Sequence, residues 1–123
     1  MEIDPLERHD GARGWVSEIY SGELGAELQN IHLGSIEPGA VRGNHRHNKS
    51  REWIAFLNGR VKVYCAQTDK TEEVIISEPS IVKFEPREEH AIENCGEETV
   101  YFTAYRDHLF TEDDPDAEPV EVI

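Results

Sequence analysis

Two histidines and a glutamate near the middle of the chain have the types and the spacing of metal ligands. His45 and His47 are two residues apart, and Glu52 follows with four residues between. On an extended segment, residues i and i+2 point to the same face, so both imidazoles can aim at one point. Glu52 begins a strand-like run in which Ile54 and Phe56 would share its face, so its carboxylate can reach the same point. The pattern indicates metal-binding chemistry with nitrogen and oxygen ligands.

The residues around this cluster resemble the first motif of the cupin family, matched at every defining position. The motif reads here Gly39-x5-His45-x-His47-x4-Glu52-x6-Gly59. A match at all of these positions is far more specific than an isolated His-x-His pair. The second cupin motif is similar to Pro86-x3-His90-x3-Asn94, with Ser80 in the place of its leading glycine. The glycine usual between the proline and the histidine is missing and that interval is one residue shorter, whereas His-x3-Asn is intact.

Carried over residue by residue, the resemblance implies that His45, His47, Glu52 and His90 bind one divalent transition metal inside a β-barrel. Three imidazoles and a carboxylate suit Zn, Fe, Mn, Ni or Cu, and the identity of the metal is left open. In the alternative, His45 and His47 are exposed loop residues, Glu52 is a solvated strand end, and His90 is an ordinary hydrogen-bonded histidine. We favour the metal hypothesis because all four ligands stand at motif spacing on a suitable strand pattern.

Two shorter stretches narrow the resemblance within the cupins. They are residues 38–45 (PGAVRGNH) and 90–96 (HAIENCG). Both are similar to the cupin domain of capsular-polysaccharide assembling enzymes that epimerise nucleotide-linked 4-keto sugars, and to sugar-isomerase cupins. The resemblance spans about residues 28–105, and it implies an epimerase-like or isomerase-like activity on a small carbohydrate-derived substrate.

Short alternating segments, separated by Gly, Pro, Asn and charged residues, run along the chain without long helical periodicity. This pattern is typical of an all-β sandwich or barrel. The strands that we expect lie at 15–20, 27–36, 52–65 (two strands), 73–77, 81–84, 90–93 and 99–105. A loop is expected after Glu37-Pro38-Gly39, and Asn58-Gly59 predicts a tight type I′ hairpin. With the resemblance, the fold class is a single-domain cupin, a double-stranded β-helix or jelly-roll barrel.

We expect residues 1–123 to form this one domain, with the barrel at about 28–105. Residues 1–27 would form an N-terminal strand arm, whose apolar part around Trp15 and Tyr20 could add to a neighbour's sheet, so a homodimer is expected. Residues 107–123 form an acidic C-terminal tail. It is either loosely held or docked through Leu109 and Phe110.

The 123-residue chain carries 12 Lys and Arg against 26 Asp and Glu, a formal net charge of -14. This surplus opposes binding to nucleic acid and to anionic membrane surfaces. No apolar stretch has the length of a spanning helix, and the N-terminus does not read as a signal peptide. We therefore expect a soluble, cytoplasmic protein.

Residues 42–62 reverse the overall charge, with six basic residues and Glu52 as the one acid. A positive region around the cluster would attract a small anionic ligand, and Arg42 and Arg46 are the candidates to hold its anionic part. The alternative is that Arg60 and Lys62 merely form a solvated hairpin face.

Few other residues suggest chemistry. His32 lies mid-strand and is either an acid or base inside the barrel or a packed core histidine, which we favour. Tyr64 could donate a phenolic proton, although packing is its default role. Arg106 is expected to be a surface charge. Cys65 and Cys95 form either one bridge or, as we favour, two free thiols.

Three functions remain open at this point. The main hypothesis is a metal-dependent epimerase or isomerase, in which the metal is a Lewis acid for a small, anionic, oxygenated substrate. The second is a dioxygenase-type cupin in which Fe(II) or a similar metal binds substrate and O2. The third is a non-catalytic cupin that uses the metal to hold a small-molecule ligand.

Overall fold

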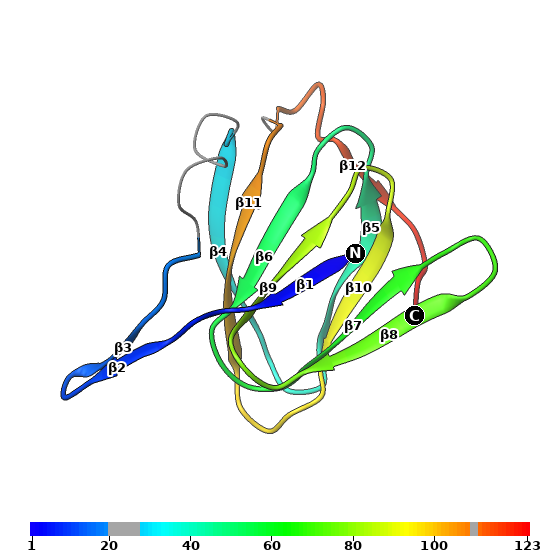
Figure 1. Cartoon of the computed structure of the whole chain (residues 1–123). Helices are drawn as coiled ribbons and strands as arrows, with labels where there is room; N and C mark the ends of the chain where they lie inside the picture. The colour runs from blue at the N-terminus through cyan, green and yellow to red at the C-terminus, as the bar shows by residue number, and fades with distance from the viewer. Residues whose placement is uncertain (20–27, 109–110) are drawn as a thin grey trace.

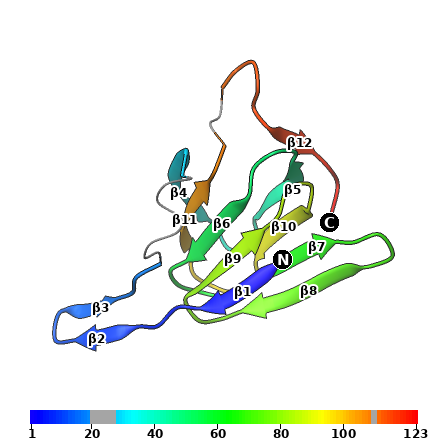
Figure 2. The same cartoon turned by 45° about the horizontal axis from the view of Figure 1, so that its top comes forward.

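Two five-stranded antiparallel sheets face each other, as Figures 1 and 2 show from two directions. The computed structural model describes residues 1–19, 28–108 and 111–123. The first sheet has the order β1 (Glu2–Pro5), β9 (Ser80–Phe84), β6 (Glu52–Phe56), β11 (Val100–Arg106), β4 (Asn30–Ile36). The second has the order β12 (Ala117–Pro119), β5 (Val41–His47), β10 (Glu89–Asn94), β7 (Val61–Ala66), β8 (Thr71–Ile76). A separate hairpin consists of β2 (His9–Gly11) and β3 (Gly14–Val16).

Alternate side chains of both sheets meet in one hydrophobic core. Ile54, Phe56 and Val82 of the first sheet pack there against Val63 and Cys65 of the second. Successive residues of a strand point to opposite faces, so the alternating apolar residues of the sequence become the two inner faces. The predicted all-β jelly roll is confirmed, since every regular element in the described ranges is a strand.

In the part of the chain that the structure describes, no helix is long and apolar enough to cross a membrane.

The segment after Glu37-Pro38-Gly39 is a strand, where the sequence predicted a loop. Gly43 and Asn44 in β5 have φ angles of 91° and 53°, and the pairing of β5 with β10 shifts register between His90 and Ala91. These are the features of a β-bulge, in which one extra residue bends the strand and increases its twist. Glycine and asparagine, which suggested a loop, are the residue types that tolerate these φ angles.

The hairpin predicted at Asn58-Gly59 is wrong, because β6 lies in the first sheet and β7 in the second. A type I′ turn needs positive φ at both central residues. Gly59 has a φ of 78°, but Asn58 is not among the described residues with positive φ. The Asn58 side chain instead donates to the Thr99 carbonyl at 2.8 Å and accepts from the Tyr101 N–H at 2.9 Å. The dipeptide therefore marks a crossing between the sheets.

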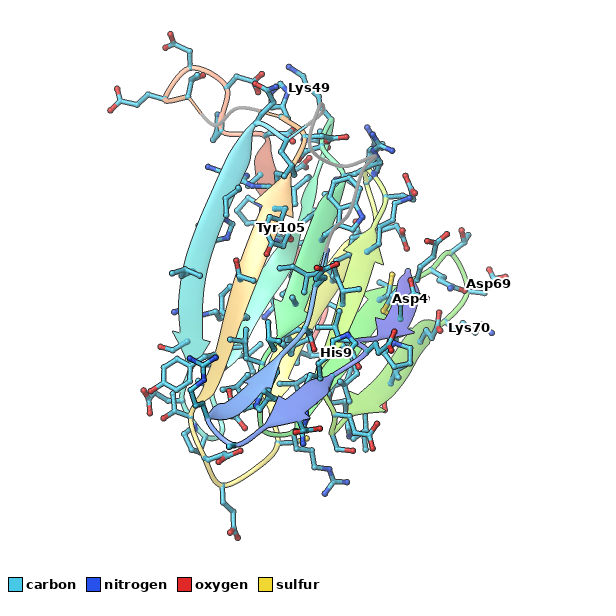
Figure 3. The ribbon with its side chains drawn as sticks, turned by 60° about the vertical axis from the view of Figure 1, so that its left-hand side comes forward. Asp4, His9, Lys49, Asp69, Lys70 and Tyr105 are labelled. Carbon is cyan, nitrogen blue, oxygen red and sulfur yellow. The ribbon has the colours of Figure 1, made fainter. Side chains whose placement is uncertain are left out.

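The strand predicted at residues 15–20 ends earlier in the structure. β3 ends at Val16, and Tyr20 lies outside the described residues. The β2–β3 hairpin is exposed throughout and projects away from the sheets (Figure 1). Figure 3 looks onto the outer face of the first sheet, where Tyr105 is labelled. Addition of the arm to a neighbour's sheet, and with it the homodimer, stays a prediction.

The acidic tail docks onto the second sheet. β12 pairs with β5 along the edge of that sheet, whereas Leu109 and Phe110 lie outside the described residues. Among the described residues, polar groups of the tail form hydrogen bonds and ion pairs with residues 46–50. Cys65 and Cys95 are both free thiols, the first buried and the second exposed.

Replacing Gly59 by alanine should destabilise the protein more than replacing Gly39. Both glycines have positive φ, 78° and 80°, so each alanine carries backbone strain of about 1–2 kcal/mol. A Cβ at Gly59 would also lie 2.7 Å from Cγ2 of the buried Val100, whereas at Gly39 it meets nothing within 4 Å. We expect Gly59→Ala to lose about 1–3 kcal/mol more. Urea unfolding of both variants measures this difference, and equal losses would contradict it.

Candidate metal centre

Four side chains from the two sheets converge in the space between them. β5 carries His45 and His47, β10 carries His90, and Glu52 begins β6 in the opposite sheet. One possible ligand atom of each residue lies within 4.8 Å of those of the other three. The structure thus brings together all four residues that the cupin motifs singled out.

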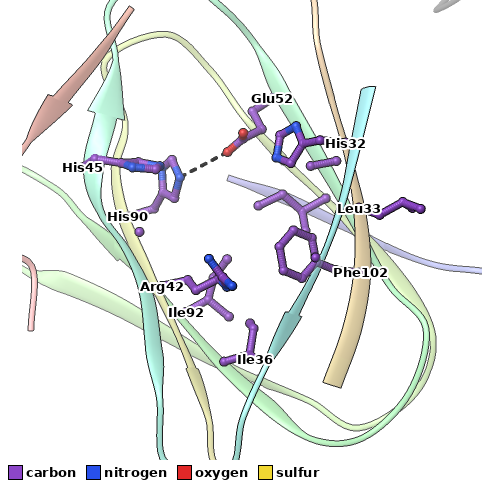
Figure 4. Close-up of a pocket in the computed structure, with 13 residues that line it drawn as sticks. His32, Leu33, Ile36, Arg42, His45, Glu52, His90, Ile92 and Phe102 are labelled. Atoms are coloured by element: carbon purple, nitrogen blue, oxygen red, sulfur yellow. Dashed lines mark ion pairs between the residues drawn. The ribbon is translucent and has the colours of Figure 1, made fainter. Parts of the chain in front are cut away.

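Glu52 lies between two of the imidazoles. Its Oε2 is 3.4 Å from Nε2 of His47, and its Oε1 is 3.4 Å from Nε2 of His90, the pair joined by the dashed line in Figure 4. The ring centre of His45 is 4.8 Å from that of each other histidine. His47, Glu52 and His90 are at most 5 % exposed, so solvent has little access to this carboxylate.

Imidazole nitrogens at the centre of this group have no hydrogen-bond partner. Nε2 of His47 and Nε2 of His90 are buried, and no described group completes a hydrogen bond to either, or to Nδ1 of His47. Buried polar atoms are nearly always paired, because an unmade hydrogen bond costs about 1–3 kcal/mol. A divalent cation would satisfy both Nε2 atoms and the Glu52 carboxylate, so the donor set fits a transition metal.

His90 is oriented by two neighbours. Its ring stacks on Phe84 with 3.9 Å between centres and 9° between planes, and its Nδ1 is 3.1 Å from the Glu88 carbonyl oxygen. Because a carbonyl only accepts, Nδ1 donates its proton to Glu88, and Nε2 is the nitrogen that faces Glu52. Such outer hydrogen bonds typically fix the tautomer of a metal-binding histidine.

The surroundings favour the neutral form of His45 and the charged form of Glu52. Burial, together with the neighbouring His90 and His47, lowers the pKa of His45 to about 4. Burial alone would raise the pKa of Glu52, but the close His47 and His90 imidazoles outweigh it and hold this pKa well below its usual range. A neutral His45 and an ionised Glu52 are the forms that bind a metal.

Arg106 is a residue of this site that sequence reasoning missed. It is 9 % exposed and not the surface charge that was expected. Its Nε lies 4.0 Å from Oε2 of Glu52, and its Nη2 donates to Oδ1 of Asn30 at 3.3 Å. The pairing of β11 with β6 places Arg106 opposite Glu52. Only that register, which is a long-range property, could have revealed the contact.

A cavity of about 210 Å³ opens beside the candidate metal centre and is lined by three of its four residues (Figure 4). Its polar end includes His45, Glu52 and His90. Its apolar wall consists of Ile36, Ile54, Ile92, Phe102 and Ala104. At about 30 Å³ for each water, the volume corresponds to roughly seven waters. The part of a ligand that enters therefore has about the size of one sugar ring or a small organic acid.

Arg42 is the one basic side chain among the described residues that lines the cavity. Its Nε donates to the Ser35 carbonyl at 2.7 Å, and its guanidinium lies 5.9 Å from the ring centre of Phe102. In Figure 4 the guanidinium points into the space between Phe102 and the histidines. The two contacts hold a positive group at the cavity; that Arg42 binds an anion there stays a prediction.

Arg46 does not line the cavity, contrary to the prediction. Its Nη1 binds Glu89 at 3.1 Å and its Nη2 binds Glu118 at 3.0 Å. Lys49 likewise binds Asp114 of the tail at 2.7 Å. The positive stretch is thus largely neutralised by acidic residues that are distant in the sequence.

His32 lines the cavity and is exposed, so the core position that we favoured for it is wrong. Figure 4 shows its ring pointing from β4 toward Glu52. Its Nδ1 lies 2.9 Å from Oδ1 of Asn30, and since that oxygen only accepts, Nδ1 is the protonated nitrogen and Nε2 can accept. Tyr64 does not line the cavity: it alternates with the core residues of β7, and its hydroxyl donates to Glu93 at 3.2 Å.

Comparison with known proteins gives distant relatives of the same fold. Oxalate decarboxylase OxdC of Bacillus subtilis (strain 168) is 23% identical over 103 residues, 83% of this chain and 26% of that protein. The capsular polysaccharide assembling protein CapF of Staphylococcus aureus superposes with a TM-score of 0.72 at 22% identity, over 97% of this chain and 33% of CapF. The structure of QdtA, a sugar 3,4-ketoisomerase from Thermoanaerobacterium thermosaccharolyticum in complex with TDP, superposes with a TM-score of 0.77 at 15% identity, over 95% of this chain and 85% of QdtA. The chain thus spans about a quarter of OxdC and a third of CapF.

One family model matches most of the chain. It is described as the polysaccharide biosynthesis C-terminal domain, and it matches residues 9–118. The matched range includes all four residues of the candidate metal centre, and also Arg42 and His32, which are among the residues that line the cavity beside it. The chain therefore belongs to the polysaccharide biosynthesis C-terminal domain family.

Proposed function

We propose that this chain is a metal-binding cupin that epimerises or isomerises a small anionic, carbohydrate-derived substrate. His45, His47, Glu52 and His90 would hold one divalent metal. The observation that carries the proposal is the pair of buried, unpartnered imidazole nitrogens beside the Glu52 carboxylate. When bound, the metal supplies a Lewis acid that stabilises negative charge on a substrate oxygen.

Arg42 would bind the anionic part of the substrate. Its Nε is occupied by Ser35 and its plane lies near Phe102, so the two Nη groups remain to form parallel hydrogen bonds to a carboxylate or phosphate. The net charge of -14 repels polyanions over most of the surface. One cationic side chain at a small cavity therefore favours a small anion.

His32 would move the proton. Both reactions remove a proton from a carbon beside a carbonyl group; isomerisation returns it to the neighbouring carbon, whereas epimerisation returns a proton to the opposite face of the same carbon. With its proton on Nδ1, His32 can accept the substrate proton on Nε2 and then give it back. Asn30 supports this role because its Oδ1 contacts Nδ1 of His32.

The names of the similar structures support a nucleotide-linked sugar as the substrate class. CapF is named for capsular polysaccharide assembly, and QdtA is a sugar 3,4-ketoisomerase with TDP bound. A cavity of about 210 Å³ would take the sugar ring and leave the nucleotide outside it.

His47→Ala should abolish stoichiometric metal binding. The substitution removes one nitrogen ligand from a buried set, so the affinity for Zn(II) should fall by more than about 100-fold. Elemental analysis of the purified protein and chelator competition measure the content and the affinity. His9→Ala, on the exposed hairpin, is the control and should keep the wild-type metal content. Undiminished Zn(II) in His47→Ala would contradict the proposed site.

His32→Gln should slow proton transfer while leaving the metal in place. In D2O, the metal-loaded wild type should exchange the proton beside the carbonyl of a nucleotide-linked 4-keto sugar for deuterium, which proton NMR detects. The variant should do so about 100-fold more slowly or worse, since it lacks the base. If the wild type with metal bound exchanges nothing across a panel of keto sugars, the chain is a ligand-binding cupin and not this enzyme.

Arg42→Gln and Arg46→Gln should differ sharply in their effect on KM for the anionic substrate. Losing the cavity arginine removes a charged hydrogen-bonding site, so KM for the anionic substrate should rise about 10–100-fold, with a smaller change in kcat. Arg46→Gln removes the same charge outside the cavity and should leave both constants nearly unchanged. Steady-state kinetics decides the point, and equal effects of the two substitutions would speak against Arg42 as the anion site.

A further inference from the structure

Two residues of the metal centre come from opposite sheets and are joined by only a short crossing. His47 ends β5 in the second sheet, and Glu52 begins β6 in the first. Residues 48–51 connect them. The position of His47 relative to Glu52 therefore depends on how this crossing is held.

Asp116, in the C-terminal segment, holds three consecutive residues of the crossing. Its Oδ1 accepts the Lys49 N–H at 2.8 Å, and its Oδ2 accepts the Ser50 N–H at 2.9 Å and the Ser50 hydroxyl at 2.5 Å. The Asn48 N–H donates to the Asp116 carbonyl at 3.1 Å. Asp116 and Ser50 are both buried. Charge-assisted hydrogen bonds of this kind are stronger than neutral ones.

The same segment also holds the bulged strand that carries two of the histidines. β12 pairs with β5 over residues 45–47, and Figure 2 shows it alongside β5. Beyond β12, the Val120 N–H donates to the Asn44 carbonyl at 2.9 Å, and the Val122 N–H donates to Oδ1 of Asn44 at 2.9 Å. Asn44 is the non-glycine residue with positive φ in the bulge. The segment thus contacts the chain on both sides of His45 and His47.

The C-terminal segment also forms two ion pairs nearer the protein surface. Lys49, labelled in Figure 3, binds Asp114, and Arg46 binds Glu118. These pairs are partly exposed, and exposed pairs contribute little. The buried Asp116 is therefore the contact on which docking of the segment to the crossing depends most.

We propose that residues 114–123 complete the metal centre and that Asp116 is a positioning residue, which fixes His47 against Glu52. This inference rests on the proposed metal-binding function. Without the Asp116 carboxylate, all four ligands are still present, but the crossing is free to move and the ligands no longer meet at one point.

Asp116→Asn in the full chain, with Co(II) as the probe, tests the proposal. The amide keeps the shape of the side chain but loses the charge and turns one acceptor into a donor that faces an N–H group. Co(II) affinity should fall about 10–100-fold, and the visible absorption of bound Co(II), which reports its coordination, should change. Asp113→Asn, an exposed acid of the same tail, should change neither.

Val74→Ala separates positioning from general stability. Val74 packs against the core from β8, which carries none of the four ligands. This variant should unfold at lower urea concentration and still bind Co(II) as the wild type does. Equal losses of Co(II) affinity in Val74→Ala and Asp116→Asn would overturn the proposal, as would wild-type affinity and absorption in Asp116→Asn.

Ser50→Ala provides a milder variant if Asp116→Asn does not fold. It removes one hydroxyl donor to Asp116 and leaves both backbone bonds, so Co(II) affinity should fall by a smaller factor. Unchanged Co(II) affinity in Ser50→Ala would then overturn the proposal. A wild-type protein that binds no Co(II) would overturn the proposed metal-binding function instead, whatever the variants do.

Discussion

The central constraint on this molecule is the burial of a glutamate and two histidines between two apolar sheet faces. Glu52 begins the same strand face that Ile54 and Phe56 continue, and a charged group there costs several kcal/mol unless it is compensated. Compensation comes from three sides: the imidazoles of His47 and His90 lie 3.4 Å away, and the Arg106 guanidinium lies 4.0 Å away. The strands that carry these groups belong to both sheets. The geometry of the site therefore depends on how the two sheets are placed relative to each other.

Opposite charges that are far apart in the sequence lie next to each other in the fold. The basic residues around β5 and the acids of the C-terminal segment meet and neutralise each other, as in the pairs of Arg46 with Glu118 and of Lys49 with Asp114. Arg42 remains at the cavity, and among the described residues it is the one basic group lining it. The acidic tail therefore has a definite place in the fold. It leaves one positive side chain where a small anion could reach it.

Strand periodicity and motif spacing are local properties, and what depended on them could be predicted: the all-β class, most strand positions, and the four residues of the centre. The hairpin at Asn58-Gly59 was mispredicted because turn propensity is a local property. The pairing of a strand depends instead on which neighbouring strands bury it. β6 is buried along its whole length between β9 and β11, and β7 could not take either place. Arg106 and the stacking of Phe84 on His90 depend on registers between distant segments. His32 was misplaced because its position in the middle of a strand suggested the core, but β4 is an edge strand and His32 is exposed.

The alternation of the chain between the sheets also bears on the order of folding. β4, β6, β9 and β11 belong to one sheet, while β5, β7, β10 and β12 belong to the other, and among the described residues β7 and β8 are the only consecutive strands of the two sheets that pair directly. Few local contacts are thus available early, and loop-closure entropy is lost before long-range pairing offsets it. Folds of this kind form slowly, within about milliseconds to seconds. Each ligand-bearing strand pairs with strands that are distant in the sequence, so we expect the histidines and the glutamate to meet late in folding.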